Sequence, residues 1–346
     1  MKLCILRLSA LGDVCHAVAM VTAIQHQRPD VEITWIIGKL EYQLLKGMQG
    51  INFVVYDKKQ GKQANHQVKQ ALSNITFDVL FVMQVALRAN LLSRVIKAKK
   101  RVGFDWHRSK EAHWLFANSR IRAQKTAHVL DGFLGFAETI GVMKESPVQW
   151  EIPIEQKEQD WAAEQLKDLG EFAVISPAAS KAERNWLPER YAATIDYLAK
   201  KGLSVVLCGG PSDLDKEISQ SILSKTNAVS LNLVGKTNLK QMLSVLGRAS
   251  LVIAPDTGPA HMATTQGTKV IGLYAHSNPR RTGPYNDLDS VVSVYDQCIQ
   301  QQTGKPWQKL PWGKRAKGKD LMALIEVETV IEAIDKVLAS KSDSLV

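Results

Sequence analysis

Short apolar segments alternate with segments of helical periodicity along most of this chain, and that alternation limits the possible folds more than any other feature. In the first half, strands are predicted at 3–8, 31–38, 51–56 and 78–84, and helices at 14–27, 63–72 and 87–97. Strands that alternate with helices form βαβ units around a mostly parallel sheet. The first half is therefore predicted to be an α/β domain.

The second half repeats this pattern. Strands are predicted at 172–176, 204–209, 251–254 and 269–274, and helices at 188–200, 238–247 and 321–339. Between the halves, the segment 145–158 carries two prolines and is typical of a linker. A length of 346 residues fits two domains of roughly 150 residues each. We predict two Rossmann-like domains, 1–155 and 156–320, with a cleft between them and ligands at the carboxyl ends of the strands.

Composition narrows the class of protein. The net charge of +10 favours an anionic partner, which could be a nucleic acid, a membrane surface or a phosphorylated substrate, but it also fits a basic soluble protein with no such partner. The four cysteines are far apart in the sequence, which argues against a zinc site or a disulfide framework and fits a reducing compartment. Because the sequence has no apolar run of about 18 residues, we expect no membrane-spanning helix and a cytoplasmic protein.

The turn after the first predicted strand reads Arg7-Leu8-Ser9-Ala10-Leu11-Gly12-Asp13. Gly12 allows the backbone to approach a ligand closely, and the helix that follows offers free N–H groups. Asp13 could accept a proton from a substrate at this position. Aspartate is also a preferred residue for capping a helix, so the catalytic and the structural interpretation both stay open.

A second turn of this kind follows the strand at 251–254 and reads Asp256-Thr257-Gly258-Pro259-Ala260-His261. Proline suits the first turn of a helix, and a glycine there allows a diphosphate to reach the backbone N–H groups. Asp256 is better suited to sugar hydroxyls than to phosphates. An ordinary capped helix is the alternative. The convergence of four chemically useful residue types on one turn favours function.

Two further loops carry weaker signals. Ser180, Lys181 and Arg184 follow the strand at 172–176 and could donate charge-assisted hydrogen bonds to phosphate, although a solvated polar loop is a common alternative. Asp213 follows the glycine pair 209–210, an arrangement that resembles ribose recognition but also suits a plain strand-to-helix turn. The sequence contains no G-x-G-x-x-G motif, so it lacks the usual NAD fingerprint.

A basic tract with interleaved aromatic residues spans 97–125. Such a tract could bind RNA or single-stranded DNA, a phosphorylated glycolipid at a membrane surface, or only solvent. The signatures H-E-x-x-H, G-x-S-x-G and the Walker loop are absent from the sequence, as is a D-x-D pair at a strand end.

Taken together, the segments 6–14 and 256–261, with the loop 179–186 between them, resemble the ADP-heptose:lipopolysaccharide heptosyltransferase family, glycosyltransferase family 9. The first half is most similar to the heptosyltransferase I type. The resemblance implies a GT-B fold and an inverting, metal-independent glycosyltransferase that uses ADP-heptose as a co-substrate, with no cofactor and no metal ligands. It also implies that the C-terminal segment 321–346 returns to the first domain.

The resemblance implies a role for each matching residue. Asp13 is implied as the catalytic base. The implied donor-binding residues are Ser9, Gly12, Ser180, Lys181, Arg184, Asp213, Thr237, Asp256, Thr257, Gly258, Pro259 and His261. The basic residues expected to bind the acceptor in the first domain are Lys58, Lys59, Lys62, Arg88, Arg108, Lys110 and Arg120. Arg184 stands where some relatives have a lysine, and Ala179 stands where a hydroxyl residue can occur, which removes one possible phosphate contact.

The expected acceptor is Kdo-lipid A or its Kdo-phosphorylated form. We expect peripheral contact with the anionic inner face of the bacterial inner membrane and no nucleic-acid partner. Two other hypotheses remain at this point. One is another GT-B enzyme that acts on a sugar nucleotide, such as an epimerase. The other is a basic nucleic-acid-binding protein, which would explain the charge but none of the turns at strand ends.

Overall fold

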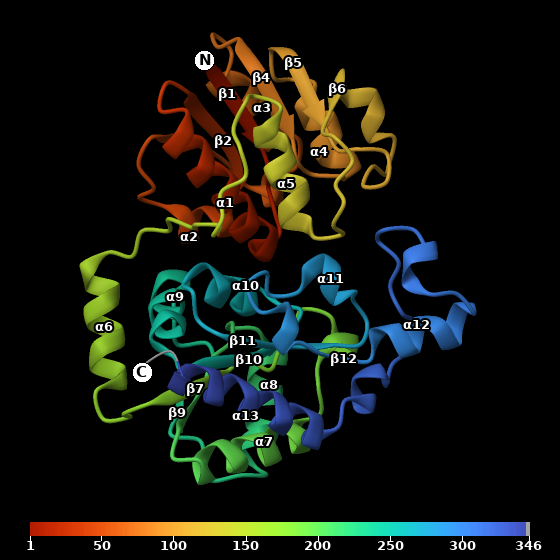
Figure 1. The fold of residues 1–346 in the computed structure, drawn as a ribbon. Helices are drawn as coiled ribbons and strands as arrows, with labels where there is room; N and C mark the ends of the chain where they lie inside the picture. The colour runs from red at the N-terminus through yellow and green to blue at the C-terminus, as the bar shows by residue number, and fades with distance from the viewer. Residues whose placement is uncertain (344–346) are drawn as a thin grey trace. The chain divides into compact units, whose positions relative to one another are not determined.

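The computed structural model describes residues 1–343, which form two compact units (Figure 1). The first unit comprises Met1–Pro153, and the second begins at Ile154. The division falls inside the proline-containing segment that the sequence predicted as a linker. Within the described range, no helix is long and apolar enough to cross a membrane.

The first unit contains a six-stranded parallel sheet with the order β3-β2-β1-β4-β5-β6. Its strands are β1 (Lys2–Leu6), β2 (Glu32–Gly38), β3 (Ile51–Tyr56), β4 (Phe77–Val82), β5 (Ala98–Gly103) and β6 (Ser119–Arg120). Its helices are α1 (Leu11–Gln27), α2 (Lys39–Leu45), α3 (Lys62–Ala71), α4 (Leu87–Ser93) and α5 (Val129–Glu138), with short 3-10 helices η1 (Lys58–Gln60) and η2 (His113–Phe116). The direction of winding reverses between β1 and β4, which are neighbours in the sheet.

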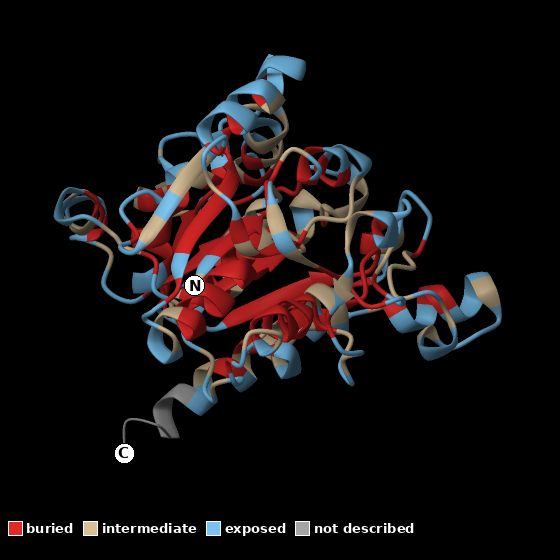
Figure 2. Ribbon diagram, turned by 90° about the horizontal axis from the view of Figure 1, so that it is seen from above, coloured by how far each residue is buried: buried red, intermediate tan, exposed pale blue. Residues whose placement is uncertain are grey.

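The central strands of this sheet are covered on both faces. Cys4 and Leu6 of β1 share a buried cluster with Ala64 and Val68 of α3, and all of these side chains are nearly inaccessible to solvent. Because successive residues of a strand point to opposite faces, a doubly covered parallel strand has a continuous apolar sequence. Figure 2 shows this core as buried strands surrounded by exposed helical surfaces.

The second unit contains another six-stranded parallel sheet, with the order β12-β11-β10-β7-β8-β9. Its strands are β7 (Phe172–Ile175), β8 (Ser204–Leu207), β9 (Leu231–Asn232), β10 (Leu251–Pro255), β11 (Val270–Tyr274) and β12 (Val292–Ser293). Its helices are α6 (Gln156–Leu166), α7 (Pro188–Lys200), α8 (Asp213–Leu223), α9 (Leu239–Arg248), α10 (Gly258–Thr265), α11 (Pro279–Thr282), α12 (Tyr295–Thr303) and α13 (Val327–Asp343). Here the winding reverses between β7 and β10. The predicted α/β class with two Rossmann-like sheets is therefore confirmed.

One predicted helix is shorter in the structure than in the sequence analysis. The segment 87–97 was predicted as helical throughout, but α4 ends at Ser93 and the chain enters β5 at Ala98. The sequence of β5 is rich in lysine and arginine, so it lacks the apolar pattern that indicates a strand. Arg101 lies on this strand, and its guanidinium donates a hydrogen bond to the Ser93 carbonyl oxygen over 2.7 Å.

The last helix, α13, contributes to the core of the second unit. Val330, Ile334 and Val337 of α13 belong to the same buried cluster as Tyr191 and Leu198 of α7. Their spacing places them on one face of the helix. The apolar face of α13 therefore completes the core of the second unit. That the C-terminal segment also packs on the first domain stays a prediction. Residues 344–346 of that segment lie outside the described range.

His113 of η2 is expected to make the first unit sensitive to acid. Its Nε2 accepts the Phe104 N–H over 3.2 Å, and its Nδ1 lies 2.8 Å from Asn90 Oδ1, so the neutral ring satisfies both partners. Burial, assisted by the charge of Arg120, lowers the pKa of His113 to about 4. In the unfolded chain, a histidine has a pKa of about 6.5. The free energy of unfolding should therefore fall by about 3 kcal/mol in total as the pH drops from about 6.5 to about 4, because the unfolded state binds the proton first.

Urea unfolding of the wild type and of His113→Gln across this pH range would measure that loss. The glutamine variant lacks the titrating group, so the difference between the two proteins should change with pH. His66→Gln, at an exposed histidine of α3, is the matched control for the same substitution at an exposed position. A difference for His113→Gln that does not change with pH would contradict the prediction.

Candidate active site

The first unit places the predicted catalytic turn at its topological switch point. In open α/β sheets, ligands bind where the direction of winding reverses, at the carboxyl ends of the strands. The turn after β1 and the segment after β4 meet there. The Leu8 N–H donates to Gln84 Oε1 over 2.8 Å, and Gln84 Nε2 donates to Ser9 Oγ over 3.2 Å. One glutamine side chain therefore fixes the predicted catalytic turn against the end of the neighbouring strand.

Asp13 caps the start of helix α1 from the third helical position and is not the N-cap residue itself. Helix α1 begins at Leu11, its N-cap is Ala10, and Asp13 is the third helical residue. Asp13 Oδ2 accepts the Ala10 N–H over 3.3 Å and forms an ion pair with Arg7. Its side chain is about one-third exposed, and Oδ1 has no hydrogen-bond partner within residues 1–343. The carboxylate is thus fixed through one oxygen, and its other oxygen is available to a substrate.

Arg7 is a positioning residue that the sequence analysis did not assign. Its guanidinium is buried, donates to the Met83 carbonyl oxygen and lies over the ring of Phe133 at 5.3 Å from the centroid. Such a rigid arginine holds its partner carboxylate more firmly than a mobile surface cation can. A charged residue inside an otherwise apolar strand end was the sequence signal for it.

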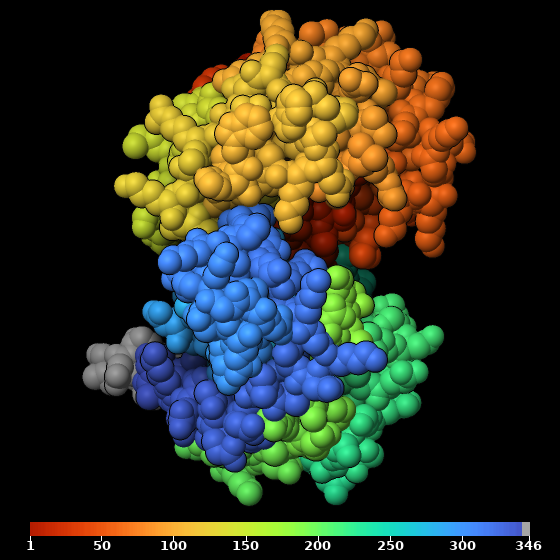
Figure 3. Space-filling model, turned by 90° about the vertical axis from the view of Figure 1, so that its right-hand side faces the viewer, coloured from red at the N-terminus to blue at the C-terminus, as the bar shows by residue number. Residues whose placement is uncertain are grey.

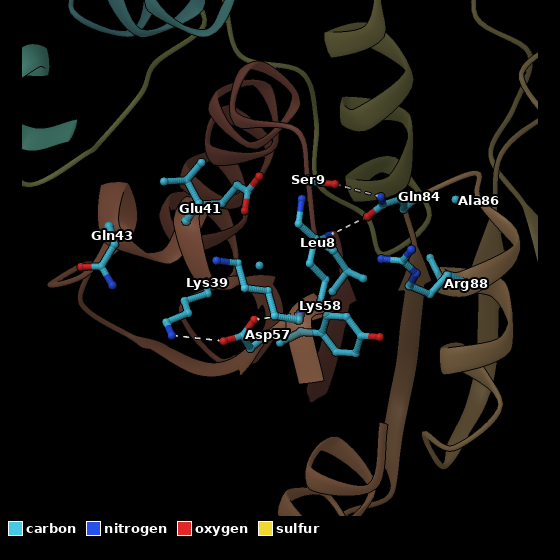
Figure 4. A pocket seen from close by; sticks show the side chains of 15 residues that line it. Leu8, Ser9, Lys39, Glu41, Gln43, Asp57, Lys58, Gln84, Ala86 and Arg88 are labelled. Carbon is cyan, nitrogen blue, oxygen red and sulfur yellow. Dashed lines mark hydrogen bonds and ion pairs between the residues drawn. The ribbon is translucent and has the colours of Figure 1, made fainter. Parts of the chain in front are cut away.

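A pocket of about 860 Å³ opens beside this turn (Figure 4). Its lining comes from the ends of β1 to β4 and includes Ser9, Gln84 and three predicted acceptor-binding residues, Lys58, Lys59 and Arg88. Figure 4 shows Lys58 and Arg88 approaching the pocket from different elements. A cavity of this size that combines apolar walls with a few charged groups is typical of a ligand site.

Glu41 also lines this pocket and was missed by the sequence analysis. It is 8% exposed. Burial raises the pKa of Glu41, while its backbone hydrogen bond and the charges of Lys58 and Arg7 act in the opposite direction. A buried carboxylate beside a cationic pocket is a candidate functional group. Its position soon after Gly38, at the end of a strand, was the available sequence signal.

The remaining predicted acceptor-binding residues lie outside this pocket. Lys62 and Lys110 are exposed, and the guanidinium of exposed Arg120 stacks on Trp106 at 3.9 Å from the ring centroid. Arg108 contradicts its prediction, because its side chain is 4% exposed and pairs with Asp105 over 2.9 Å. It also donates to the Thr126 carbonyl oxygen over 2.7 Å. Arg108 therefore stabilises its own loop, and we no longer assign it to the acceptor.

The second unit brings two predicted motifs together at its own switch point, where the loop after β7 meets the turn after β10. Arg184 Nη1 lies 3.2 Å from Asp256 Oδ2 and donates to the Asp256 carbonyl oxygen over 3.2 Å. His261 Nε2 lies 3.7 Å from Asp256 Oδ1. Burial raises the pKa of Asp256, but the hydrogen bond from His261 and the charge of Arg184 outweigh it and hold this pKa well below its usual range. Asp256 is therefore a carboxylate with a fixed orientation.

Helix α10 starts without a side-chain cap. Thr257 is its N-cap, but the Thr257 hydroxyl donates to the Ala178 carbonyl oxygen over 3.3 Å and makes no capping bond. Gly258 and Pro259 follow as the first two helical residues. The alternative of an ordinary capped helix is therefore not what the structure shows. Uncapped N–H groups at a helix start can bind an anion such as phosphate.

The other predicted donor-binding residues lie on neighbouring loops of the same unit. Ser180 and Lys181 are exposed in the loop after β7, and Asp213 is exposed at the first position of α8. Asp215, rather than Asp213, holds the glycine turn, by accepting the Gly210 N–H over 2.8 Å. The hydroxyl of Thr237 is buried, and it has no hydrogen-bond partner in the described part of the chain.

Arg315 is a further basic residue of this site that the sequence analysis left unassigned. Its guanidinium is half-buried, and this desolvation, together with the charges of Arg184 and Arg281, lowers the pKa of Arg315. The backbone on either side is fixed, since the Lys314 carbonyl oxygen accepts the Tyr295 hydroxyl over 2.9 Å and the Ala316 N–H donates to His276 over 3.1 Å. The charges of Asp256 and Glu183 act in the opposite direction on this pKa, so Arg315 lies in a site that contains both basic and acidic groups.

Comparison with known proteins identifies the family to which this chain belongs. Residues 65–310 match the family described as glycosyltransferase family 9 (heptosyltransferase). The chain belongs to glycosyltransferase family 9. This family 9 glycosyltransferase is 48% identical to the lipopolysaccharide core heptosyltransferase OpsX of Haemophilus influenzae, over 97% of this chain and 96% of that protein.

Two solved structures share the fold of this family 9 glycosyltransferase. A family 9 glycosyltransferase from Veillonella parvula aligns with a TM-score of 0.79 at 23% identity, covering 98% of this chain and 97% of the other. The Escherichia coli heptosyltransferase WaaC, solved with ADP, aligns with a TM-score of 0.73 at 19% identity, covering 97% and 100%. The resemblance stated from the sequence and the predicted GT-B fold are thereby confirmed.

Proposed function

We propose that this family 9 enzyme transfers heptose from ADP-L-glycero-D-manno-heptose to a Kdo residue of the lipopolysaccharide inner core, as enzymes of the heptosyltransferase I type do. The high identity to a lipopolysaccharide core heptosyltransferase supports the pathway. The observation that carries the proposal is the presence of a switch-point site in each unit. The first has a cationic pocket and a partly exposed carboxylate, and the second has an uncapped helix start and a fixed aspartate.

The second unit has the chemistry that a nucleotide sugar requires. The N–H groups at the start of α10 and the guanidinium of Arg184 suit the diphosphate. Asp256 and His261 suit the hydroxyls of the sugar, since a fixed carboxylate accepts hydrogen bonds from hydroxyls and repels phosphates. We assign Asp213 to the ribose and Thr237 to the adenine pocket. Thr257, Pro259, Ser180 and Lys181 complete the proposed donor site, to which we also assign Ser9 and Gly12 of the first unit.

The first unit has the chemistry that an anionic acceptor requires. Lys58, Lys59 and Arg88 line one pocket, and their charges suit the carboxylate of Kdo and a phosphate attached to it or to lipid A. We extend the proposed acceptor site to the exposed cations Lys62, Lys110 and Arg120. The buried carboxylate of Glu41 lies among these cations and suits the acceptor's hydroxyl groups.

The proposed reaction is a single inverting displacement. Asp13 takes the proton from the acceptor hydroxyl while that oxygen attacks the anomeric carbon of heptose, and the bond from this carbon to ADP breaks. Negative charge develops on the leaving ADP, where Arg184 and the N–H groups of α10 can stabilise it without a metal ion. We place this reaction at the cytoplasmic face of the inner membrane, with the enzyme bound peripherally.

Release of ADP from ADP-heptose by the purified enzyme tests this proposal. We expect ADP release that depends on Kdo-lipid A and continues in EDTA. Because the reaction inverts the anomeric carbon, a β-configured ADP-heptose should give an α-linked product. Incubation with ADP-heptose alone or with a UDP-sugar alone is the control for an epimerase. Acceptor-independent conversion of either nucleotide, or no release with any Kdo acceptor, would contradict the proposal.

Arg315 is expected to contribute to binding of the donor's diphosphate. Arg315→Ala should weaken ADP binding about tenfold, because a charge-assisted hydrogen bond contributes about 1.5–3 kcal/mol. Adenosine, which lacks phosphate, should bind both proteins equally. Isothermal titration calorimetry measures the affinity of each protein for ADP and for adenosine. Lys317→Ala, at an exposed cation two residues away, is the matched control and should bind ADP like the wild type. Equal ADP affinity of Arg315→Ala and wild type would remove Arg315 from the site.

A further inference from the structure

The first unit exposes five large apolar side chains within one short stretch of sequence. Their exposed fractions are 55% for Leu87, 48% for Leu91, 64% for Trp106, 48% for Trp114 and 58% for Leu115. We call these five residues the 87–115 patch. Scattered exposed apolar residues are normal on a soluble protein, but a group of this kind marks an interaction surface.

The structure holds the α4 and η2 parts of this patch rigidly together. The Leu87 N–H donates to the Glu111 carboxylate over 2.6 Å, and Asn90 donates to the Glu111 carbonyl oxygen over 3.2 Å. His113 contacts Asn90 over 2.8 Å. Leu87 and Leu91 are one helical turn apart, so both lie on the same face of α4. The segment containing α4 and η2, coloured orange to yellow, lies on the face of the first unit that Figure 3 turns toward the viewer.

Exposed cations occur in the same stretch of chain as these apolar side chains. Arg94 lies over the ring of Phe116 at 5.2 Å, and Arg120 lies over the ring of Trp106 at 3.9 Å. Arg88 and Lys110 are also exposed in this stretch. No carboxylate forms an ion pair with any of these four cations within residues 1–343. Tryptophan and leucine beside unpaired arginine and lysine form the combination that binds the interface of an anionic bilayer, where apolar groups enter the acyl boundary and cations meet the headgroups.

The patch adjoins the proposed acceptor pocket through a shared helix. Arg88 and Ala89 of α4 line the pocket, while Leu87 and Leu91 of the same helix are exposed outside it. A lipid-linked acceptor has its sugar next to the headgroups and its acyl chains in the bilayer. A pocket for the sugar beside a surface for the bilayer matches that arrangement.

We propose that the 87–115 patch inserts into the interface of an anionic lipid bilayer and so presents the pocket to acceptors anchored there. The inference rests on the proposed function for the identity of the acceptor, and it replaces a purely electrostatic contact with one that also buries apolar side chains. The bilayer is favoured over a protein partner because the exposed cations in the same stretch of chain complement a continuous anionic surface.

Flotation of the full-length protein with lipid vesicles tests the surface. Wild type should bind vesicles containing phosphatidylglycerol and should bind phosphatidylcholine vesicles weakly. Leu87→Ser combined with Leu91→Ser should lower partitioning about tenfold, since that corresponds to about 1.4 kcal/mol, less than full burial of two leucine side chains. Met143→Ser is the matched control, because Met143 is 76% exposed on the same unit and lies outside the patch. It should partition like the wild type.

A second measurement identifies the inserted side chains. Brominated lipid should quench tryptophan fluorescence of the wild type, and Trp114→Phe should lose part of this quenching while it still floats with vesicles. Thermal unfolding of each variant checks that the first unit stays folded. Equal partitioning of the leucine variant and the wild type, or no binding of wild type to anionic vesicles, would overturn the proposal. Loss of a concentration-dependent dimer in the leucine variant would assign the patch to a second copy instead.

Activity separates this inference from the proposed function. The leucine variant should lose activity toward a Kdo-lipid A acceptor embedded in vesicles and keep activity toward a deacylated acceptor in solution. ADP affinity should stay the same as in wild type. If the wild type transfers heptose to neither acceptor, the proposed function fails, whatever the vesicle binding shows. If the leucine variant changes activity toward the two acceptors equally, the membrane role of the patch fails and the proposed function stands.

Discussion

Asp13→Asn is expected to lower the turnover of acceptor-dependent ADP release about 10³-fold, within the range of about 10²–10⁴ that a positioned base contributes. Asparagine has nearly the same shape as aspartate and can still accept the Ala10 N–H, so helix α1 should start normally. It cannot take a proton from the acceptor hydroxyl. The expected loss therefore appears in kcat, with little change in the affinity for ADP.

Three measurements distinguish a base from a structural residue. Thermal unfolding should show a smaller effect than the loss of a fully buried pair, since Asp13 is about one-third exposed although its partner Arg7 is buried. Asp30→Asn is the matched control, because Asp30 is also paired with an arginine, at 2.7 Å from Arg28, but is not the proposed base. This variant should keep full turnover. Arg7→Lys should lower turnover less than Asp13→Asn does, because a lysine keeps the charge but not the fixed geometry. Full turnover in Asp13→Asn would leave Asp13 with a structural role only.

Asp256→Asn is expected to destabilise the second unit by about 3 kcal/mol and to abolish measurable binding of the sugar donor. The substitution keeps the volume but removes the negative charge that Arg184 and His261 face in a buried position. Loss of one partner from a buried ion pair costs about 3–5 kcal/mol, because the remaining charge has lost its counter-charge. Asp296→Asn is the matched control: Asp296 pairs with Arg280 over 2.9 Å but is about half exposed, so its loss should cost about 0–1 kcal/mol.

The pH dependence of this effect has a definite sign. The folded state lowers the pKa of Asp256, so its ionised form contributes stability above the unfolded pKa of about 3.9. The gap in unfolding free energy between wild type and Asp256→Asn should be constant at neutral pH and should shrink as the pH falls below about 4. Urea unfolding at several pH values measures the gap. A gap that widens in acid would mean that Asp256 does not act as a depressed carboxylate.

Local signals allowed much of the fold and half of the candidate site to be predicted. Gly12 and Gly258 each lie in the first turn of a helix that follows an apolar strand, so the strand end and the helix start are encoded within a few residues. Rossmann-like sheets place such turns at one edge. The meeting of the Arg184 loop with the Asp256 turn then follows from the sheet order, since β7 and β10 are neighbours.

Features that depend on distant parts of the chain could not be predicted in this way. The charge of Arg184 acts on Arg315 only because the segment before α13 folds back, with the Ala316 N–H donating to the His276 carbonyl oxygen. Arg108 looked like a surface cation because its partner Asp105 is buried with it by the surrounding loop. The charged residues of β5 concealed a strand that pairs on both sides. In each case packing between remote segments outweighs the local pattern.

The packing of α13 within the second unit has a consequence for the way enzymes of this family can be recombined. The chain passes from one unit to the other once, at Pro153–Ile154, so each unit is a single uninterrupted stretch of the gene. A chimera of two family members therefore needs one junction instead of two, and it breaks neither hydrophobic core. Under the proposed function, acceptor preference should then be inherited with the first 153 residues and recognition of the ADP part of the donor with the remainder.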